Sequence, residues 1–192
     1  MEQLFIKAVE YLKRYPLKNL ATLKHLSLYK NKLDLSILNN RFHITRGNSY
    51  VSYSCSSIIN SFPPETVQES HVLTDEAVAL ISRNGYTLQE LKKYFENGSV
   101  WFGYIESGEI KSICFMYQNH ENIWEIAGVH TVEAERKKGF GRIVVLSALR
   151  YLLAKGLIPR YEVDIKNIAS INLAEGLGMK QFLKIDHFLL HL

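Results

Sequence analysis

A chain of 192 residues, 47% of them hydrophobic, can bury a full-sized core, which excludes a fibrous or disordered protein. Its net charge of +4 is modest and its Lys and Arg residues are scattered, so we do not expect it to bind nucleic acid. No window approaches the roughly 18 uncharged apolar residues of a membrane span, and the N-terminus lacks a signal-peptide pattern. We therefore expect a cytoplasmic protein that does not bind a membrane.

The two cysteines, Cys55 and Cys114, lie far apart and have no Cys or His at metal-ligand spacing. They predict neither a disulfide framework nor a metal site, and we interpret both as small core residues. No bound metal is expected.

The chain is predicted to open with two short helices. Apolar residues recur at helical spacing over residues 4–15 and again over 17–28, with Pro16 between them. The alternating residues 49–56 then predict a half-buried strand, with Ser52 on the side opposite Val51.

Pro63 and Pro64 predict a boundary, because neither residue has a backbone donor with which to continue a strand or helix. We therefore expect an N-terminal extension over residues 1–62 and a main domain over 65–192. Without a low-complexity linker between them, the two parts are expected to pack together.

Two helices are predicted at the start of the main domain. Thr74 and Asp75 form a favourable helix start, and Thr87 with Glu90 forms a capping box before a second amphipathic run. The Asn-Gly pair at 97–98 ends that second helix.

Three antiparallel strands are predicted next, over residues 100–105, 110–118 and 123–131. The chain then continues with helix, strand, helix and strand, over residues 142–155, 161–165, 168–177 and 180–190. From Thr74 onward the predicted order is ααβββαβαβ.

Two glycines, Gly139 and Gly141, stand between a predicted strand and a predicted helix. Glycines let a backbone approach an anion closely, and the helix that follows offers unpaired N–H groups and the positive end of its dipole. A helix start ordinarily favours acidic residues, yet four cations surround these glycines: Arg136, Lys137, Lys138 and Arg142. The segment predicts a phosphate or pyrophosphate site, with a basic solvent-exposed turn as the alternative.

Two common nucleotide-binding motifs are excluded at this loop. No Gly-Lys-Ser/Thr follows four spaced residues, and the third glycine of the Rossmann pattern is replaced. A nucleotide triphosphatase or a dehydrogenase is therefore not expected.

The loop instead resembles motif A of the GCN5-related (GNAT) acetyltransferases. Their Gln/Arg-x-x-Gly-x-Gly/Ala pattern is matched by Arg136, Gly139 and Gly141, after the strand 124–131.

Residues 161–179 resemble motif B of the same superfamily, with a strand, an Asn-x-x-Ala/Ser helix start at Asn167 and Ser170, and a Leu-Gly ending. The amino-acid sequences of both segments are most similar to the FR47-like branch, which is related to glycine N-acyltransferases. The match covers residues 74 to about 187.

This resemblance implies an α+β GNAT fold, in which helices flank a mixed, mostly antiparallel central sheet, here with an N-terminal helical and strand extension. It implies that acetyl-CoA, or another acyl-CoA, pairs through its pantetheine arm with the strand before the loop, while the loop amides hold its pyrophosphate. The residues implied to contact it are Val129, Thr131, Arg136, Lys137, Lys138, Gly139, Phe140, Gly141, Arg142, Asn167 and Ser170. A helix N-cap is the structural alternative for Asn167.

Acyl transfer from a thioester to an amine by direct attack in a ternary complex needs a base for the amine and a proton donor for the leaving thiolate. Strand alternation places Glu125 on one face with Ala127, Val129 and Thr131, and we interpret Glu125 as the base, acting directly or through water. A solvated or paired carboxylate is the alternative. His130 is expected on the opposite face, in a structural role.

The tyrosine that the family uses as an acid is replaced here by Ala174. We expect Tyr161 or a water molecule to protonate the thiolate, unless the low pKa of a thiol lets it leave without an acid. Because of this departure, a non-catalytic acyl-CoA-binding module is the alternative function, and a basic interaction domain is a third.

The sequence thus predicts an N-acyltransferase, most simply an N-acetyltransferase, that modifies a primary amine of a small molecule or amino acid as a monomer or homodimer. Residues 1–62 resemble the partial acyltransferase-like half that precedes some FR47-like domains, with Tyr15–Leu20 similar to their Pro-Leu-x-Asn-Leu turn. Such a unit would narrow the acceptor cleft, which favours a small amine.

Overall fold

The computed structural model describes residues 25–28, 43–58 and 67–191. They fall into two compact units, of which the smaller takes the chain up to Ser49 together with residues 185–192. The larger unit takes residues 50–184. All the residues predicted to act in catalysis or to bind the cofactor lie in the larger unit.

Some predictions for the N-terminal part lie outside the described residues. These are the helix over 4–15, most of the helix over 17–28, and the boundary at Pro63 and Pro64.

The end of the second predicted helix is instead a strand. Strand β1 (His25–Leu28) pairs antiparallel with strand β8 (Lys180–His191), with His25 opposite Leu189. The prediction of helix for residues 25–28 is therefore wrong. Pairing with β8 gives this segment hydrogen-bond partners along one side of the strand, and such tertiary pairing overrides a weak helical pattern.

A sheet forms the centre of the larger unit, with the strand order β2-β7-β6-β5-β4-β3. Its strands are β2 (His43–Ser54), β3 (Val67–Ser70), β4 (Val100–Glu106), β5 (Glu109–His120), β6 (Ile123–Thr131) and β7 (Ile158–Asp164). Neighbouring strands are antiparallel except β6 and β7, which are parallel. The predicted mixed, mostly antiparallel sheet is confirmed.

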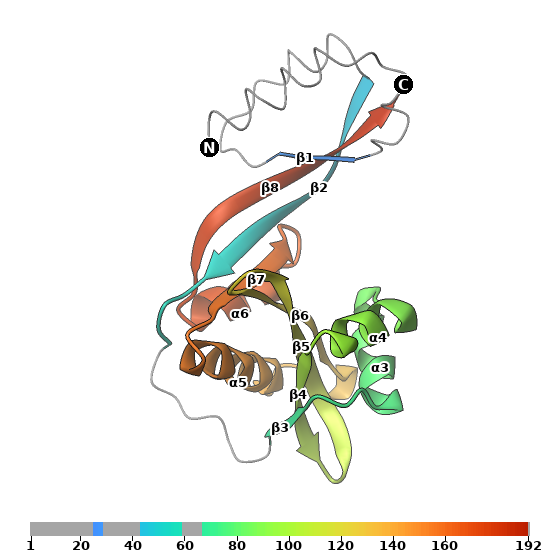
Figure 1. Ribbon diagram of the computed structural model, residues 1–192, viewed down its shortest axis with the longest axis vertical. Coiled ribbons are helices and arrows are strands. Elements are labelled where there is room, and N and C mark those ends of the chain that lie inside the picture. Colours follow the sequence, from blue (N-terminus) through green and yellow to red (C-terminus); the bar gives the residue numbers. More distant parts are fainter. Residues whose placement is uncertain (1–24, 29–42, 59–66, 192) are drawn as a thin grey trace. The chain divides into compact units, whose positions relative to one another are not determined.

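Helices cover both faces of this sheet (Figure 1). They are α3 (Asp75–Ile81), α4 (Leu88–Glu96), α5 (Phe140–Ala154) and α6 (Ile168–Gly176), with the short 3-10 turns η2 (Ser82–Asn84) and η3 (Glu133–Glu135). On one face, α5 and α6 bury Val145 and Leu149 with Ile126 of β6 in one apolar cluster. On the other, α3 and α4 bury Ile81 and Leu91 against Phe115 of β5.

The element order predicted from Thr74 onward is confirmed. Thr74 caps α3 by accepting a hydrogen bond from the Ala77 backbone, and the capping box of α4 is complete, with both Thr87–Glu90 bonds formed. Helix α5 begins at Phe140, two residues before its predicted start, so Gly141 lies in its first turn. Strand β3 was not predicted, because its sequence Val-Gln-Glu-Ser has no alternation of apolar residues.

Strand β2 is buried on both faces where it pairs with β7. Val51 and Tyr53 enter the core as predicted, but Ser52 is also fully buried. The prediction of a half-buried strand is therefore wrong at Ser52, whose hydroxyl joins a polar network described below.

Candidate active site

The parallel strands β6 and β7 pair at their beginnings and then separate. Their register runs from Ile123–Ile158 through Trp124–Pro159 to Glu125–Arg160, and no later pair joins these two described strands. Immediately after the last pair, Glu125 Oε1 accepts a hydrogen bond from the backbone N–H of Glu162 at 2.8 Å. The Glu125 carboxylate thus occupies the point where the two strands diverge.

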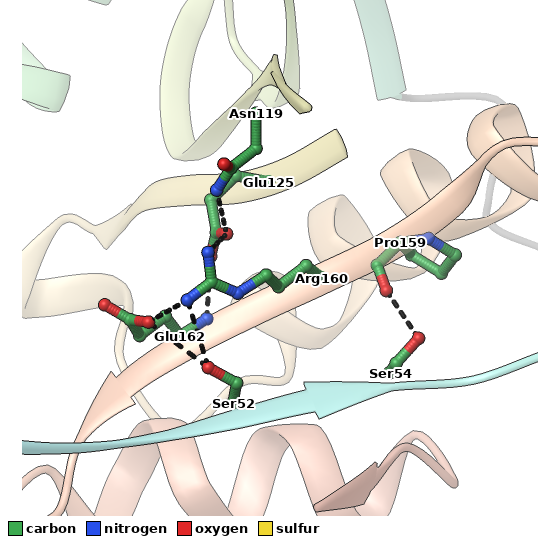
Figure 2. A network of polar contacts seen from close by, with 7 residues as sticks. All are labelled: Ser52, Ser54, Asn119, Glu125, Pro159, Arg160 and Glu162. Atoms are coloured by element: carbon green, nitrogen blue, oxygen red, sulfur yellow. Dashed lines mark hydrogen bonds and ion pairs between the residues drawn. The ribbon is translucent and has the colours of Figure 1, made fainter. Parts of the chain in front are cut away.

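Glu125 is almost completely buried, with 4% of its surface exposed, and its carboxylate is held by three partners. Besides the Glu162 amide, these are the Asn119 side chain, with Nδ2 at 3.3 Å, and the Arg160 guanidinium, with Nη1 at 3.3 Å from Oε2. Figure 2 shows that the Arg160 side chain bridges Glu125 to Glu162 and Ser52.

Burial raises the pKa of Glu125 to about 7, from an ordinary value of 4.5, because desolvation disfavours the carboxylate. The charge of Arg160, the Glu162 amide and Asn119 act in the opposite direction, whereas the negative charge of Glu162 adds to the rise. A carboxyl group with a pKa near neutrality can both take and return a proton at neutral pH, as a general base must.

A bulge at Gly128 divides β6 into two halves that face differently. Ile113 of β5 lies opposite His130 and Phe115 opposite Ala127, so Gly128 and Val129 together face a single β5 residue. Gly128 has φ +59°, and a Cβ there would lie 2.8 Å from the Phe115 ring. Glycine is therefore required at this position.

Because of the bulge, the side chains of β6 share faces of the sheet differently from the prediction by alternation. Ala127 packs with the α3 and α4 cluster, but Val129 packs with the α5 and α6 cluster. The Thr131 hydroxyl faces the start of α5, since a Cβ on Gly141 would lie 3.4 Å from its Oγ1. The prediction that Glu125, Ala127, Val129 and Thr131 share one face is wrong, because the extra residue reverses the alternation.

His130 lies half-buried on β6, after the bulge. Burial lowers the pKa of His130, and the positive charges of Arg136 and Arg83 lower it further. Arg83 belongs to η2, so His130 lies within range of the helical layer formed by α3 and η2, the same layer that covers Ala127. His130 therefore lies on the same face as Glu125 and Ala127, and the prediction that it lies on the opposite face is wrong, because the bulge reverses the alternation. Its structural role stays a prediction.

The turn before α5 has the geometry of an anion-binding nest. Lys137 and Gly139 both adopt left-handed backbone conformations, with φ +64° and +87°. Gly139 is the N-cap of α5, whose first turn has neither an acidic residue nor a side-chain cap. Among the described residues, no acceptor pairs with any backbone N–H from Lys137 to Arg142. Consecutive free N–H groups at a helix start are what a phosphate group binds.

Most cations of this turn already have partners within the protein. Arg136 Nε donates to the Thr131 carbonyl at 3.4 Å, and Lys138 pairs with Glu135 at 2.6 Å. Arg142 donates to the Gly176 carbonyl at 2.6 Å, which links the first turn of α5 to the end of α6. The groups that this turn offers to an anion are therefore mainly backbone N–H groups, with the side chains setting the local charge.

The predicted motif B residues come together between β7 and α6. Asn167 caps α6, its Oδ1 accepting a hydrogen bond from the Ser170 backbone at 3.1 Å, as its structural interpretation predicted. Tyr161 is buried beside this turn, and burial raises its pKa to about 12, although a hydrogen bond from Ser170 acts in the opposite direction. Ala174, one turn after Ser170, is fully buried in the core.

Four residues of the network around Glu125 were not predicted as site residues: Ser52, Asn119, Arg160 and Glu162. The charged residues Arg160 and Glu162 alternate with buried residues on β7, which is also the pattern of a solvent-facing strand. Only the position of β2 and β6 beside β7 shows that these charges point toward Glu125.

The described residues show neither a metal site nor a membrane-spanning helix. No group of three or more His, Cys, Asp or Glu side chains could hold a metal ion there. No described helix is long and apolar enough to cross a membrane.

The comparisons with solved structures agree with this geometry. An acetyltransferase of the GNAT family from Colwellia psychrerythraea superposes with a TM-score of 0.67 at 14% identity, over 88% of this chain and 65% of that one. A GCN5-related N-acetyltransferase from Kribbella flavida superposes with a TM-score of 0.62 at 11% identity, over 95% and 71%. An acetyltransferase from Bacillus subtilis, solved in complex with CoA, gives 0.55 at 16% identity, over 66% and 98%. At these identities the likeness concerns the fold.

Sequence comparison identifies the family. No curated protein matches this chain. The family model for GNAT acetyltransferases matches residues 74–184, a stretch that contains the diverging strands, the glycine turn and α6. More than half of the chain is covered, and it therefore belongs to the GNAT acetyltransferase family.

Proposed function

We propose that this protein transfers an acetyl group from acetyl-CoA to a primary amine of a small molecule or amino acid. The observation that carries the proposal is the run of unpaired backbone N–H groups from Lys137 to Arg142, which faces no protein acceptor among the described residues. The relative from Bacillus subtilis, which was solved with CoA, supports the choice of ligand.

The backbone conformation of the turn supports this choice of cosubstrate. The left-handed conformations at Lys137 and Gly139 turn successive N–H groups toward one side, where a pyrophosphate would be held. Val129 and Thr131 follow the bulge, and both side chains lie on the α5 side of the sheet. In the proposed complex their backbone groups pair with the pantetheine arm, as the family resemblance implies. Asn167 and Ser170 border the same side from α6.

Acetyl-CoA supplies an activated thioester carbonyl. In the proposed reaction Glu125 removes a proton from the acceptor amine, directly or through water, because its pKa of about 7 leaves much of it ionised at neutral pH. Tyr161 stays protonated at this pH and holds a proton at its hydroxyl for the leaving thiolate, in place of the tyrosine that Ala174 replaces. Positioning of the two substrates contributes much of the remaining rate.

Aromatic side chains surround Glu125 on the α3 and α4 face. Tyr117 lies opposite Glu125 across the β5–β6 pair, Tyr94 stacks on Tyr117 with ring centroids 4.3 Å apart, and Tyr86 packs edge-on against Tyr94. These rings favour an acceptor with an apolar part, and their faces attract a cationic amine before it loses its proton. Amines with an apolar chain or ring are therefore the first to screen.

We also propose that the chain belongs to the FR47-like branch, because the sequences of the two motifs resemble that branch. We further propose that it acts in the cytoplasm. Free Cys55 and Cys114 fit a reducing compartment. One observation favours a second candidate function, a non-catalytic acyl-CoA-binding module: the family's tyrosine is replaced by the fully buried Ala174.

The first test is calorimetric titration of the protein with acetyl-CoA, using two substitutions at one glycine. Gly141→Asp places a negative charge among the unpaired N–H groups and should weaken binding on the order of 100-fold. In the part of the chain that the structure describes, the Cβ of Gly141→Ala meets Thr131 Oγ1 alone, at 3.4 Å. This variant should therefore fold normally and weaken binding less than about tenfold. Unchanged binding by folded Gly141→Asp would refute the site.

The second test separates the enzyme from the binding module. Thiol release is followed while acetyl-CoA and a panel of amines are added to the parent protein. Amine-dependent release supports the transferase, whereas tight binding without release from any amine favours the module.

A further inference from the structure

Strand β2 precedes the stretch that matches the family, yet it takes part in the network around Glu125 (Figure 2). The Ser52 hydroxyl is fully buried and donates to Glu162 Oε2 at 3.2 Å. It also accepts a hydrogen bond from Arg160 Nη2 at 3.2 Å. A buried hydroxyl that both donates and accepts fixes the orientation of its two charged neighbours.

Arg160 connects this hydroxyl to Glu125. Its Nη1 lies 3.3 Å from Glu125 Oε2, while its Nη2 contacts both Glu162 and Ser52. The planar guanidinium has a rigid fork of donors, so fixing one nitrogen fixes the other. Ser52 and Glu162 therefore determine where the positive charge stands relative to Glu125.

We infer that Arg160 is a positioning residue that holds the carboxylate of Glu125, and that β2 supports Arg160 through Ser52. The inference rests on the proposed function, in which Glu125 is the base. It extends the active site beyond residues 74–184 to a strand that the family model does not include.

Four tyrosines lie around Glu125: Tyr117 on β5, Tyr161 on β7, and Tyr86 with Tyr94 on the α3 and α4 side. Burial raises the pKa of Tyr117, Tyr161 and Tyr86, those of the last two to about 12. Among the described residues, Arg160 and Glu162 are the charged groups that act on Glu125.

Removing the positive charge should make Glu125 harder to ionise. Arg160→Met leaves Glu125 beside the negative Glu162, so the Glu125 pKa should rise by about 1 pH unit or more. Ser52→Ala keeps the charge but frees its orientation, and should raise the pKa by roughly half a pH unit. Ser54→Ala is the matched control, because the one partner of the Ser54 hydroxyl among the described residues is the Pro159 carbonyl, at 2.7 Å on the same strand pair.

The Glu125 titration can be measured without any substrate. Protein labelled with carbon-13 at the glutamate carboxyl is titrated by NMR, and Glu125→Gln identifies the resonance. The inference is supported if the midpoint moves to higher pH in Arg160→Met and less in Ser52→Ala, with Ser54→Ala unchanged. It is overturned if Ser52→Ala and Ser54→Ala behave alike or if Arg160→Met leaves the midpoint unchanged. If Arg160→Met does not fold, the difference between the midpoints of Ser52→Ala and Ser54→Ala decides whether the inference holds.

The catalytic consequence is measured separately. The acid limb of kcat/KM for acetyl transfer should move in the same order across the three variants, with an acceptor whose amine titrates well below pH 6. If no amine is acetylated, the proposed function fails while the NMR titration still decides the arrangement of Arg160. If the NMR midpoint moves and the rate profile does not, the positioning role in catalysis is overturned.

Discussion

The two parts of the candidate site are built in opposite ways. The turn proposed to bind an anion is one continuous segment, from Arg136 to Arg142, and the role proposed for it depends mainly on backbone N–H groups. The network around Glu125 is assembled from side chains of four strands, with Ser52 and Glu162 separated by 110 residues. Substitutions should therefore separate the two parts: the turn governs binding of acetyl-CoA, and the network governs the rate and pH dependence of transfer.

The largest expected effect separates rate from binding. Glu125→Gln should lower kcat by about 100- to 10,000-fold, the contribution of a general base, and leave acetyl-CoA affinity unchanged. In the parent, kcat/KM should rise with pH up to about 7 and then level, because Glu125 works only when ionised. The measurement is a pH–rate profile with an amine of low pKa.

A stability experiment checks the same residue without substrate. The pKa of Glu125 is higher in the folded protein than its ordinary value of 4.5, so the folded state retains the proton longer. Glu125 makes its full contribution to the free energy of unfolding below pH 4.5. This contribution, on the order of 3 kcal/mol, is lost as the pH rises toward 7. Urea unfolding should show a flatter pH dependence for Glu125→Gln over this range; an identical slope, or weaker acetyl-CoA binding, would contradict the assignment.

The next effect concerns the bulge that divides β6. Gly128→Ala forces a left-handed backbone on alanine and places its Cβ 2.8 Å from the Phe115 ring, so unfolding should require about 3 kcal/mol less. Gly98→Ala is the control, because its φ is +88° but no atom of the described residues lies within 4 Å of the added Cβ. It should cost only about 1 kcal/mol. Equal losses in urea unfolding would show that the contact with Phe115 is unimportant.

The smallest effect compares two buried tyrosines that reach α6. Tyr161→Phe removes the proposed proton donor and should lower kcat about tenfold. Tyr53→Phe removes a hydrogen bond to Glu175 Oε1, 3.1 Å long, and should cost about 1 kcal/mol of stability without changing kcat. Steady-state rates and thermal unfolding of both variants provide the comparison. If Tyr53→Phe lowered kcat and Tyr161→Phe did not, Tyr53 and not Tyr161 would be the proton donor.

The sequence predicted the helix caps well because the information for a cap is local. Glycine spacing and the capping residues Thr87 and Asn167 follow from backbone geometry within a few residues, and the structure confirms the caps. The faces of β6 were mispredicted after Gly128, since a bulge arises from pairing with β5 and leaves the alternation of the sequence unchanged. The partners of Glu125 were missed for a similar reason: no local pattern reports that β2 lies beside β7.

The end of α6 is held from two directions. The Gly176 carbonyl accepts a hydrogen bond from Arg142 of α5, and the neighbouring Glu175 accepts one from Tyr53 of β2. Adjacent residues of a single helical turn share their backbone, so loosening one contact changes the cost of losing the other. The energetic effects of changing Arg142 and Tyr53 are therefore coupled, and a double-mutant cycle across this turn will not be additive. Although one of these side chains lies in the anion-binding turn and the other in a strand outside the family match, α6 makes them parts of one cooperative unit.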